Sequence, residues 1–284
     1  MQSGKHSTFF SPDDVRYVLD CFRQNRRLVS DNPLCSLTAI DLLLVHQQWP
    51  RIVDLRAYVL HSILFDLCFE KLKSLRRLHG LAPPKRFKDY PSKSAALNEL
   101  QQDVLKDVDL LRIWGYLYFC YMETDIGISF DDFGDVWAVT ARTMRRVRDD
   151  AVQSVFDELV QLEREAIQQY IHQRNLSALP KVSSDTFVGR VTEKKRLLDA
   201  LLSEDRTRIL ITGRPAIGKT SLVSISLHQM LDGTHPFRNI IWVYAPERIE
   251  QLATRLKHAL GLHPSEVSLS DFLQASPALI VIDN

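Results

Sequence analysis

The stretch from residue 208 to residue 224 constrains the fold of this chain more than any other. Its sequence, RILITGRPAIGKTSLVS, predicts a short strand at 208–212, then a glycine loop and the start of a helix. Gly213, Gly218, Lys219 and Thr220 satisfy the pattern G-x-x-x-x-G-K-[ST]. In such a loop the glycines let successive backbone N–H groups point inward at phosphate oxygens, and the positive end of the following helix faces the same point. The stretch therefore predicts a nucleotide-binding site.

The residues of this loop have predicted roles. We expect Lys219 to reach the β- and γ-phosphates and the Thr220 hydroxyl to hold Mg²⁺. The residues expected to bind the nucleotide here are Gly213, Arg214, Pro215, Ala216, Ile217, Gly218, Lys219, Thr220 and Ser221. The expected ligand is ATP or ADP together with Mg²⁺.

Around the loop, predicted strands alternate with predicted helices. Apolar strands are expected at 239–245 and 278–283, and helices at 221–231 and 248–260. This alternation predicts a parallel, doubly wound sheet whose site lies at the carboxyl ends of the strands. Asp283 ends the last strand, where a carboxylate orients Mg²⁺ through water, so we predict that it is the Walker B aspartate. Lys219 and Asp283 are thus the predicted catalytic residues, and Thr220 and Asp283 the predicted metal ligands.

Three sequence boxes, in this order, resemble a known family. They are Phe-Val-Gly-Arg-x-x-Glu at 187–193, the loop at 213–220 and the strand that ends in Asp283 and Asn284. Residues 187–284 thereby resemble the STAND class of phosphate-loop NTPases, of the NB-ARC kind and similar to AAA proteins. The resemblance implies a phosphate-loop α/β sandwich that works as an ADP/ATP switch and oligomerises when triggered. It also implies that Val188 and Arg190 contact the adenine base.

The chain departs from the family pattern at several positions. Ala216 stands where the family often has a third glycine; at a positive φ, alanine costs of order 1 kcal/mol and would reduce nucleotide affinity. Asn284 stands where fast ATPases of related classes have a glutamate that activates water, so we expect slow hydrolysis, as suits a switch. Val191 replaces the acid that frequently follows the Gly-Arg pair. The family also has a later strand between those at 208–212 and 278–283, so we expect a sheet that is incomplete at the C-terminus and a longer full-length protein.

The first half of the chain is predicted to be all-helical. Helices are expected from Ser11, from Ser36 to 48, and at 53–78, 95–108 and 109–122, and nothing before residue 180 has the pattern of a strand. One helix carries the aromatic residues Trp114, Tyr116, Tyr118, Phe119 and Tyr121. Their spacing places aromatic rings all round this helix, which favours a buried core over a base-stacking platform. We assign residues 1–126 to an N-terminal helical region.

Residues 127–175 are predicted to form a helix-turn-helix-like unit with a long second helix. We expect Gly134 where the two helices cross closely, Ala138 in the turn, and Thr140 as the cap of the second helix. The arginines near the start of that helix are Arg142, Arg145, Arg146 and Arg148. A helix that enters a DNA groove carries such residues at its start, and the first three are the predicted DNA contacts. The unit resembles the helix-turn-helix of sigma-factor region four.

The long second helix has another interpretation. Asp149 and Asp150 partly cancel the arginines, and the apolar spacing continues towards Tyr170, so the helix also suits a solvated coupling rod in a scaffold. Residues 176–186 lack this spacing and are rich in serine and proline. They are predicted to be the linker to an NTPase domain at 187–284.

Composition limits the setting in which the protein works. The net charge of +1 indicates neither a nucleic-acid coat nor a membrane surface, so any basic face is local. The four cysteines contain no C-x-x-C pair, which favours free thiols in a reducing compartment. No apolar run reaches the roughly 18 residues of a membrane span, and the first ten residues lack the apolar core of a signal peptide. We therefore expect a cytoplasmic protein without a membrane partner.

The leading hypothesis is a bacterial signal-transduction NTPase whose nucleotide exchange changes its assembly state. One output is transcription control through DNA. The other is a scaffold in a defence or death-like pathway, in which the helical half binds another protein or itself. A housekeeping ATPase such as a helicase loader is a third class, which Asn284 disfavours.

Overall fold

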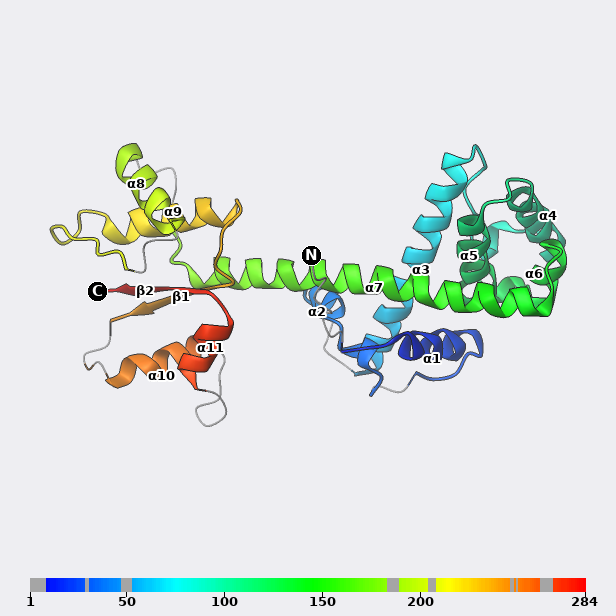
Figure 1. The fold of residues 1–284 in the computed structure, drawn as a ribbon, viewed down its shortest axis with the longest axis horizontal. Coiled ribbons are helices and arrows are strands. Elements are labelled where there is room, and N and C mark those ends of the chain that lie inside the picture. The colour runs from blue at the N-terminus through cyan, green and yellow to red at the C-terminus, as the bar shows by residue number, and fades with distance from the viewer. Residues whose placement is uncertain are drawn as a thin grey trace. The chain divides into compact units, whose positions relative to one another are not determined.

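The computed structural model describes residues 9–28, 31–46, 53–182, 189–203, 208–245, 248, 250–260 and 268–284. The chain divides into two compact units, Met1–Ile167 and Gln168–Asn284 (Figure 1). The described residues of the first unit form helices and connecting segments, as the sequence predicts. Those of the second unit form helices around a two-stranded parallel sheet.

The first unit begins with a helix whose limits follow from local chemistry. Its elements are α1 (Pro12–Arg23), η1 (Pro33–Ser36), α2 (Thr38–His46), α3 (Val53–Leu78), η2 (Phe87–Asp89), α4 (Lys93–Val104), α5 (Asp109–Leu117), η3 (Tyr118–Met122), η4 (Thr124–Ile126), α6 (Phe130–Val136) and α7 (Ala141–Ala178). Ser11 caps α1 in a capping box, in which its side chain accepts from the Asp14 N–H and the Asp14 carboxylate accepts from the Ser11 N–H. After α3 the chain turns at Gly80, whose φ of 71° suits a residue without a Cβ.

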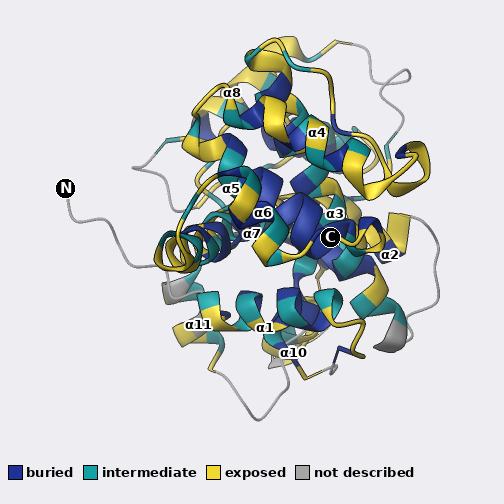
Figure 2. Ribbon diagram, turned by 90° about the vertical axis from the view of Figure 1, so that its right-hand side faces the viewer, coloured by how far each residue is buried: buried dark blue, intermediate teal, exposed yellow. Residues whose placement is uncertain are grey.

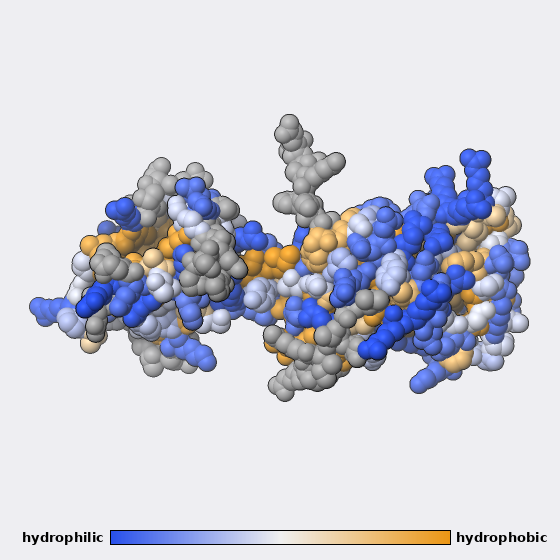
Figure 3. Space-filling model, turned by 90° about the horizontal axis from the view of Figure 1, so that it is seen from below, coloured by the Kyte–Doolittle hydropathy of each residue, from blue (hydrophilic) through white to orange (hydrophobic). Residues whose placement is uncertain are grey.

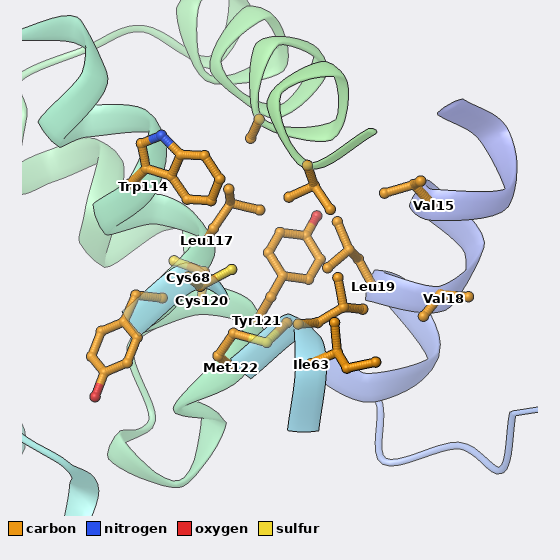
Figure 4. Packing of buried hydrophobic residues seen from close by; sticks show 14 of the residues in the cluster. Val15, Val18, Leu19, Ile63, Cys68, Trp114, Leu117, Cys120, Tyr121 and Met122 are labelled. Carbon is orange, nitrogen blue, oxygen red and sulfur yellow. The ribbon is translucent and has the colours of Figure 1, made fainter. Parts of the chain in front are cut away.

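The first unit is held by one large apolar core. Helices show buried positions on one side and exposed positions on the other (Figure 2), while hydrophilic side chains dominate the outer face visible in Figure 3. Val15, Val18 and Leu19 of α1 face Tyr121 and its neighbours across the core (Figure 4). All five aromatic side chains of the 114–121 cluster are buried, with at most 4% of any of them exposed. The expectation that this cluster is core is therefore confirmed.

A buried ionic cluster lies between α3 and α4. Arg76 is fully buried and pairs with Glu99 and, at 3.1 Å, with Asp103. The Tyr90 hydroxyl donates to Glu99 at 2.9 Å. Both Asp103 oxygens lack a hydrogen bond from the described residues, because the approach of Arg76 is close but poorly aligned. Burial raises the pKa of Asp103 to about 6, against the lowering effect of Arg76 and with a further increase from Glu99.

This cluster generates a prediction about stability and pH. The folded-state pKa of Asp103 lies above its usual 3.8, so the folded chain binds an extra proton between pH 4 and 6, and stability falls as pH rises through that window. Asp103→Asn, which stays neutral, should match the wild type near pH 4. Near pH 7 it should be more stable by an amount on the order of 2 kcal/mol. Urea denaturation across this pH range tests this, with the exposed Asp135→Asn as control; parallel pH curves for wild type and Asp103→Asn would contradict it.

The second unit is a two-faced sheet with helices on both sides. Its elements are α8 (Val191–Leu201), α9 (Lys219–Leu231), β1 (Asn239–Tyr244), α10 (Glu250–Ala259), α11 (Leu269–Ala275) and β2 (Ala278–Asp283). β1 and β2 pair in parallel from Asn239 opposite Ala278 to Tyr244 opposite Asp283. Alternate strand residues contact α9 on one face and α10 on the other, and Figure 1 shows these helices on opposite sides of the sheet.

The strand expected at 208–212 is not present in the structure. These residues form no strand, because no described strand lies beside them to pair with their backbone groups. Ile209 and Leu210, apolar residues suited to a sheet interior, are 40% and 88% exposed. The parallel order expected for the two later strands is present in β1 and β2.

The expected linker at 176–186 also differs from the structure. Helix α7 continues to Ala178, and Leu176 and Leu179 pack in the apolar cluster beside α9. The division between the units falls after Ile167, within this helix, rather than after residue 175. The helix continues beyond the point where its apolar spacing weakens, because Leu176 and Leu179 pack against an apolar surface. Residues 183–186 lie outside the described residues.

Candidate functional site

The glycine loop leads directly into α9. Gly218, with a φ of 89°, precedes the first residue of this helix, Lys219. A Cβ added at Gly213 would lie 3.2 Å from the Ile217 side chain, so the loop closes tightly over this glycine. A glycine-rich turn at the start of a helix leaves backbone N–H groups free for an anion. The predicted residues 213–218 therefore form a loop that leads into the first turn of α9, which contains 219–221.

Ala216 has a positive φ, the backbone conformation in which alanine is expected to cost more than the family's glycine. Its φ is 58°, in the left-handed region that an alanine adopts at a cost of order 1 kcal/mol relative to glycine. The left-handed conformation on which the expected free-energy cost depends is therefore present at Ala216. Its effect on nucleotide affinity stays a prediction.

Two basic side chains hold the carbonyl groups of the loop. The Lys219 Nζ donates to the Gly213 and Arg214 carbonyl oxygens at 3.1 and 3.2 Å. Arg190, the residue before α8, donates from Nη2 to the Ile217 carbonyl oxygen. Arg190 thus lies beside the loop, and its contact with an adenine base stays a prediction; Val188 lies outside the described residues.

Thr220 and Asp283 meet at the end of the sheet. The Thr220 hydroxyl donates towards both Asp283 carboxylate oxygens, at 3.0 and 3.1 Å, although the two residues are 63 positions apart. The first turn of α9 supplies the hydroxyl, and the carboxyl end of β2 supplies the carboxylate. A hydroxyl and a carboxylate beside a glycine turn provide oxygen ligands of the kind that Mg²⁺ prefers, and phosphate and water could complete its shell. The described residues contain no cluster of three or more His, Cys, Asp or Glu side chains able to hold a metal by themselves.

The predicted helix-turn-helix occupies α6 and the start of α7. A Cβ added at Gly134 would lie 3.4 Å from Met144 Cγ, so the two helices do cross closely there. Ala138 makes the turn at a φ of 50°, and the Thr140 hydroxyl accepts from the Thr143 N–H at 3.3 Å. The turn position that is often a glycine is thus occupied by Ala138, whose positive φ is strained in the same way as that of Ala216.

The arginines of α7 separate into two groups. Arg142, Arg145 and Arg146 are exposed, and Arg146 lies 3.8 Å from Asp150 in a loose pair along the helix. Arg148 instead forms an ion pair with Asp20 of α1 at 2.9 Å, and Asp149 pairs with Arg16 of the same helix at 3.0 Å. Arg148 therefore fastens α7 to α1 and is removed from the predicted basic face. Spacing along one helix gives no signal for such long-range pairs.

Comparison of the chain with protein-family models, with curated proteins and with solved structures gives no match. Within the described residues, no helix combines the length and the apolar character that crossing a bilayer requires.

The Thr220–Asp283 contact predicts an energetic coupling in the nucleotide-free protein. Thr220→Val and Asp283→Ala each remove one side of the bond, and their double-mutant cycle should give a coupling energy of about 1 kcal/mol. Ser221→Ala, one residue further along α9, should show almost no coupling to Asp283→Ala. Urea denaturation in the presence of EDTA, followed through amide resonances of β1 and β2, measures both cycles. Equal coupling in the two cycles would contradict the contact.

Proposed function

We propose that this chain is a Mg²⁺-dependent ATP/ADP-binding signal-transduction NTPase of the STAND class, with a phosphate-loop α/β domain of the NB-ARC or AAA-like kind. The single observation that carries the proposal is the contact between Thr220 and Asp283 beside a glycine turn at the start of α9. These are the two protein oxygen ligands that a Mg²⁺-nucleotide site needs.

In this proposal each site residue has one task. The loop amides bind the phosphates, Lys219 leaves the loop carbonyls for the β- and γ-phosphates, and Thr220 and Asp283 hold Mg²⁺ directly or through water. Mg²⁺ would neutralise charge on the phosphates. Asn284, whose amide is not basic, follows Asp283 in place of a water-activating carboxylate. The enzyme activity is then a slow NTP hydrolysis that resets a switch.

The switch would act in the cytoplasm by changing self-association through the NTPase domain. A nucleotide changes such an equilibrium only by its difference in affinity for the two assembly states. ATP and ADP differ by the γ-phosphate, which Lys219 and the Mg²⁺ ligands would contact. The loop and Asp283 would therefore make contacts with ATP that they do not make with ADP. This difference is what a switch requires.

Nucleotide binding has a clear expected pattern. A fluorescent ADP should bind the wild-type chain in Mg²⁺, and Lys219→Ala should lose most of this binding because a phosphate contact disappears. Thr220→Ala and Asp283→Asn should weaken binding in Mg²⁺ but change little in EDTA, where no metal is bound. Lys195→Ala, an exposed lysine on α8, is the control for loss of one positive charge. Equal binding by Lys219→Ala and the wild type would contradict the proposal.

The output that we propose first is DNA binding through the start of α7. Arg142, Arg145 and Arg146 are exposed at the start of the second helix of a helix-turn-helix, which is the position of groove contacts. The alternative is that the helical half is a protein-interaction module of a defence or death-like scaffold. The large apolar core and the mixed charges of that half are compatible with either output.

A salt titration separates these outputs. With a random 30-base-pair duplex as the probe, affinity should fall steeply with salt, and replacing Arg142, Arg145 and Arg146 by alanine should reduce the magnitude of the log–log slope by about 2 to 3. The control triple variant, Arg77→Ala, Lys88→Ala and Lys106→Ala, removes the same charge from exposed positions of the same unit. Absence of duplex binding, or the same loss in both variants, would favour the scaffold.

A further inference from the structure

β1 has one edge that no strand covers among the described residues. The Asn239 N–H donates to Pro277 and the Ala245 N–H to Asp283, so odd-numbered residues of β1 face β2. Because backbone groups alternate in direction along a strand, Ile240, Trp242 and Tyr244 direct theirs to the opposite edge. The Arg238 carbonyl also faces that edge, whereas the Arg238 N–H donates to the Pro277 carbonyl. An edge of this kind normally pairs with another strand or must be blocked.

The end of α7 occupies this edge. Asn175 is only 1% exposed, its Nδ2 donates to the Arg238 carbonyl at 3.2 Å, and its Oδ1 accepts from the Ile240 N–H at 3.1 Å. A carboxamide that accepts from one backbone N–H and donates to the carbonyl two residues earlier repeats the bonding of the N–H and C=O of one residue in a neighbouring parallel strand.

Further contacts hold the last turns of α7 against the sheet and against α9. Arg174 donates to the Asn239 side chain, which in turn donates to the Ser276 hydroxyl at 2.7 Å. The Ser224 hydroxyl of α9 donates to the Pro180 carbonyl at 2.7 Å. Leu176 and Leu179 pack with apolar residues of α9. At the other end of the same edge, Arg255 of α10 donates to the Tyr244 carbonyl at 3.0 Å.

We propose that Asn175 is the edge cap of this sheet: the end of α7 takes the place of a strand beside β1, and the sheet accepts further strands only beside β2. Residues 174–180 are then an integral part of the second unit, and α7 cannot leave β1 without losing the partners of the buried Ile240 N–H and of the Arg238 carbonyl. A regulatory signal that shifts or unwinds the end of α7 would act first on β1. The proposal does not depend on nucleotide binding.

Amide hydrogen exchange of the full chain, resolved by NMR, tests the cap. In the wild type, the Ile240 amide should be protected to the same degree as the inward-facing amides of Ile241 and Val243, although no strand covers it. Asn175→Leu has almost the same shape but no hydrogen-bonding groups, and the Ile240 amide should exchange about tenfold faster or more. Asn175→Asp keeps an acceptor oxygen, so Ile240 should stay protected. Gln173→Ala, an exposed position on the same helix, is the control and should change nothing.

Each of three results would overturn the proposal. The first is rapid exchange of Ile240 in the wild type, which needs no variant and is decisive even if Asn175→Leu fails to fold. The second is unchanged Ile240 protection in a folded Asn175→Leu chain. The third is an equal loss of protection in Asn175→Asp and Asn175→Leu, which would mean that packing rather than the hydrogen bond covers the edge. Loss of nucleotide binding with normal Ile240 protection would affect only the proposed function.

Discussion

The hydrogen bond between the Thr220 hydroxyl and the Asp283 carboxylate joins the two halves of the candidate site. It fixes the first turn of α9 at the carboxyl end of β2, across 63 positions of sequence. β2 is in register with β1, so the bond also places the glycine turn over the end of the sheet where Tyr244 and Asp283 lie side by side. Parallel α/β sheets bind ligands at this end because the loops after the strands converge there. The apolar packing of α9 against the same sheet supports this arrangement.

The loop itself is strained and held in place. Ala216 remains in a left-handed conformation, while Lys219 and Arg190 engage three of the loop carbonyls. A strained backbone persists where surrounding contacts over-determine it, and such positions gather at ligand-binding sites. At the edge of β1, the cap at Asn175 plays a comparable stabilising role. The loop end of the second unit is thus set by α9, and the edge of β1 by the last turns of α7.

Local signals predicted much of the helical half. Helix α3 has the predicted limits because a glycine and two prolines follow it, and the Gly134 crossing followed from the need for a small residue. The failures share one cause, which is dependence on distant partners. The residues at 208–212 have the composition of a strand but no described strand to pair with. Arg148, which the sequence groups with the three predicted DNA contacts, pairs with Asp20. Similarly, Leu176 and Asn175 lie where the helical spacing weakens, and only the apolar cluster and the β1 edge explain why the helix continues. Thr220 and Asp283 could be predicted as ligands of one Mg²⁺ because each belongs to a spaced motif; Asn175 belongs to none.

Thermal unfolding of the full chain with and without Mg-ADP measures the central claim most directly. A ligand that binds only the folded state stabilises it by about 2.7 kcal/mol at a concentration of one hundred times its dissociation constant. We expect Mg-ADP to raise the melting temperature of the Gln168–Asn284 unit, with little effect on the helical unit. We also expect this increase to vanish in Lys219→Ala. An unchanged melting temperature at saturating Mg-ADP, or an equal increase in Lys219→Ala, would contradict a nucleotide site at this loop.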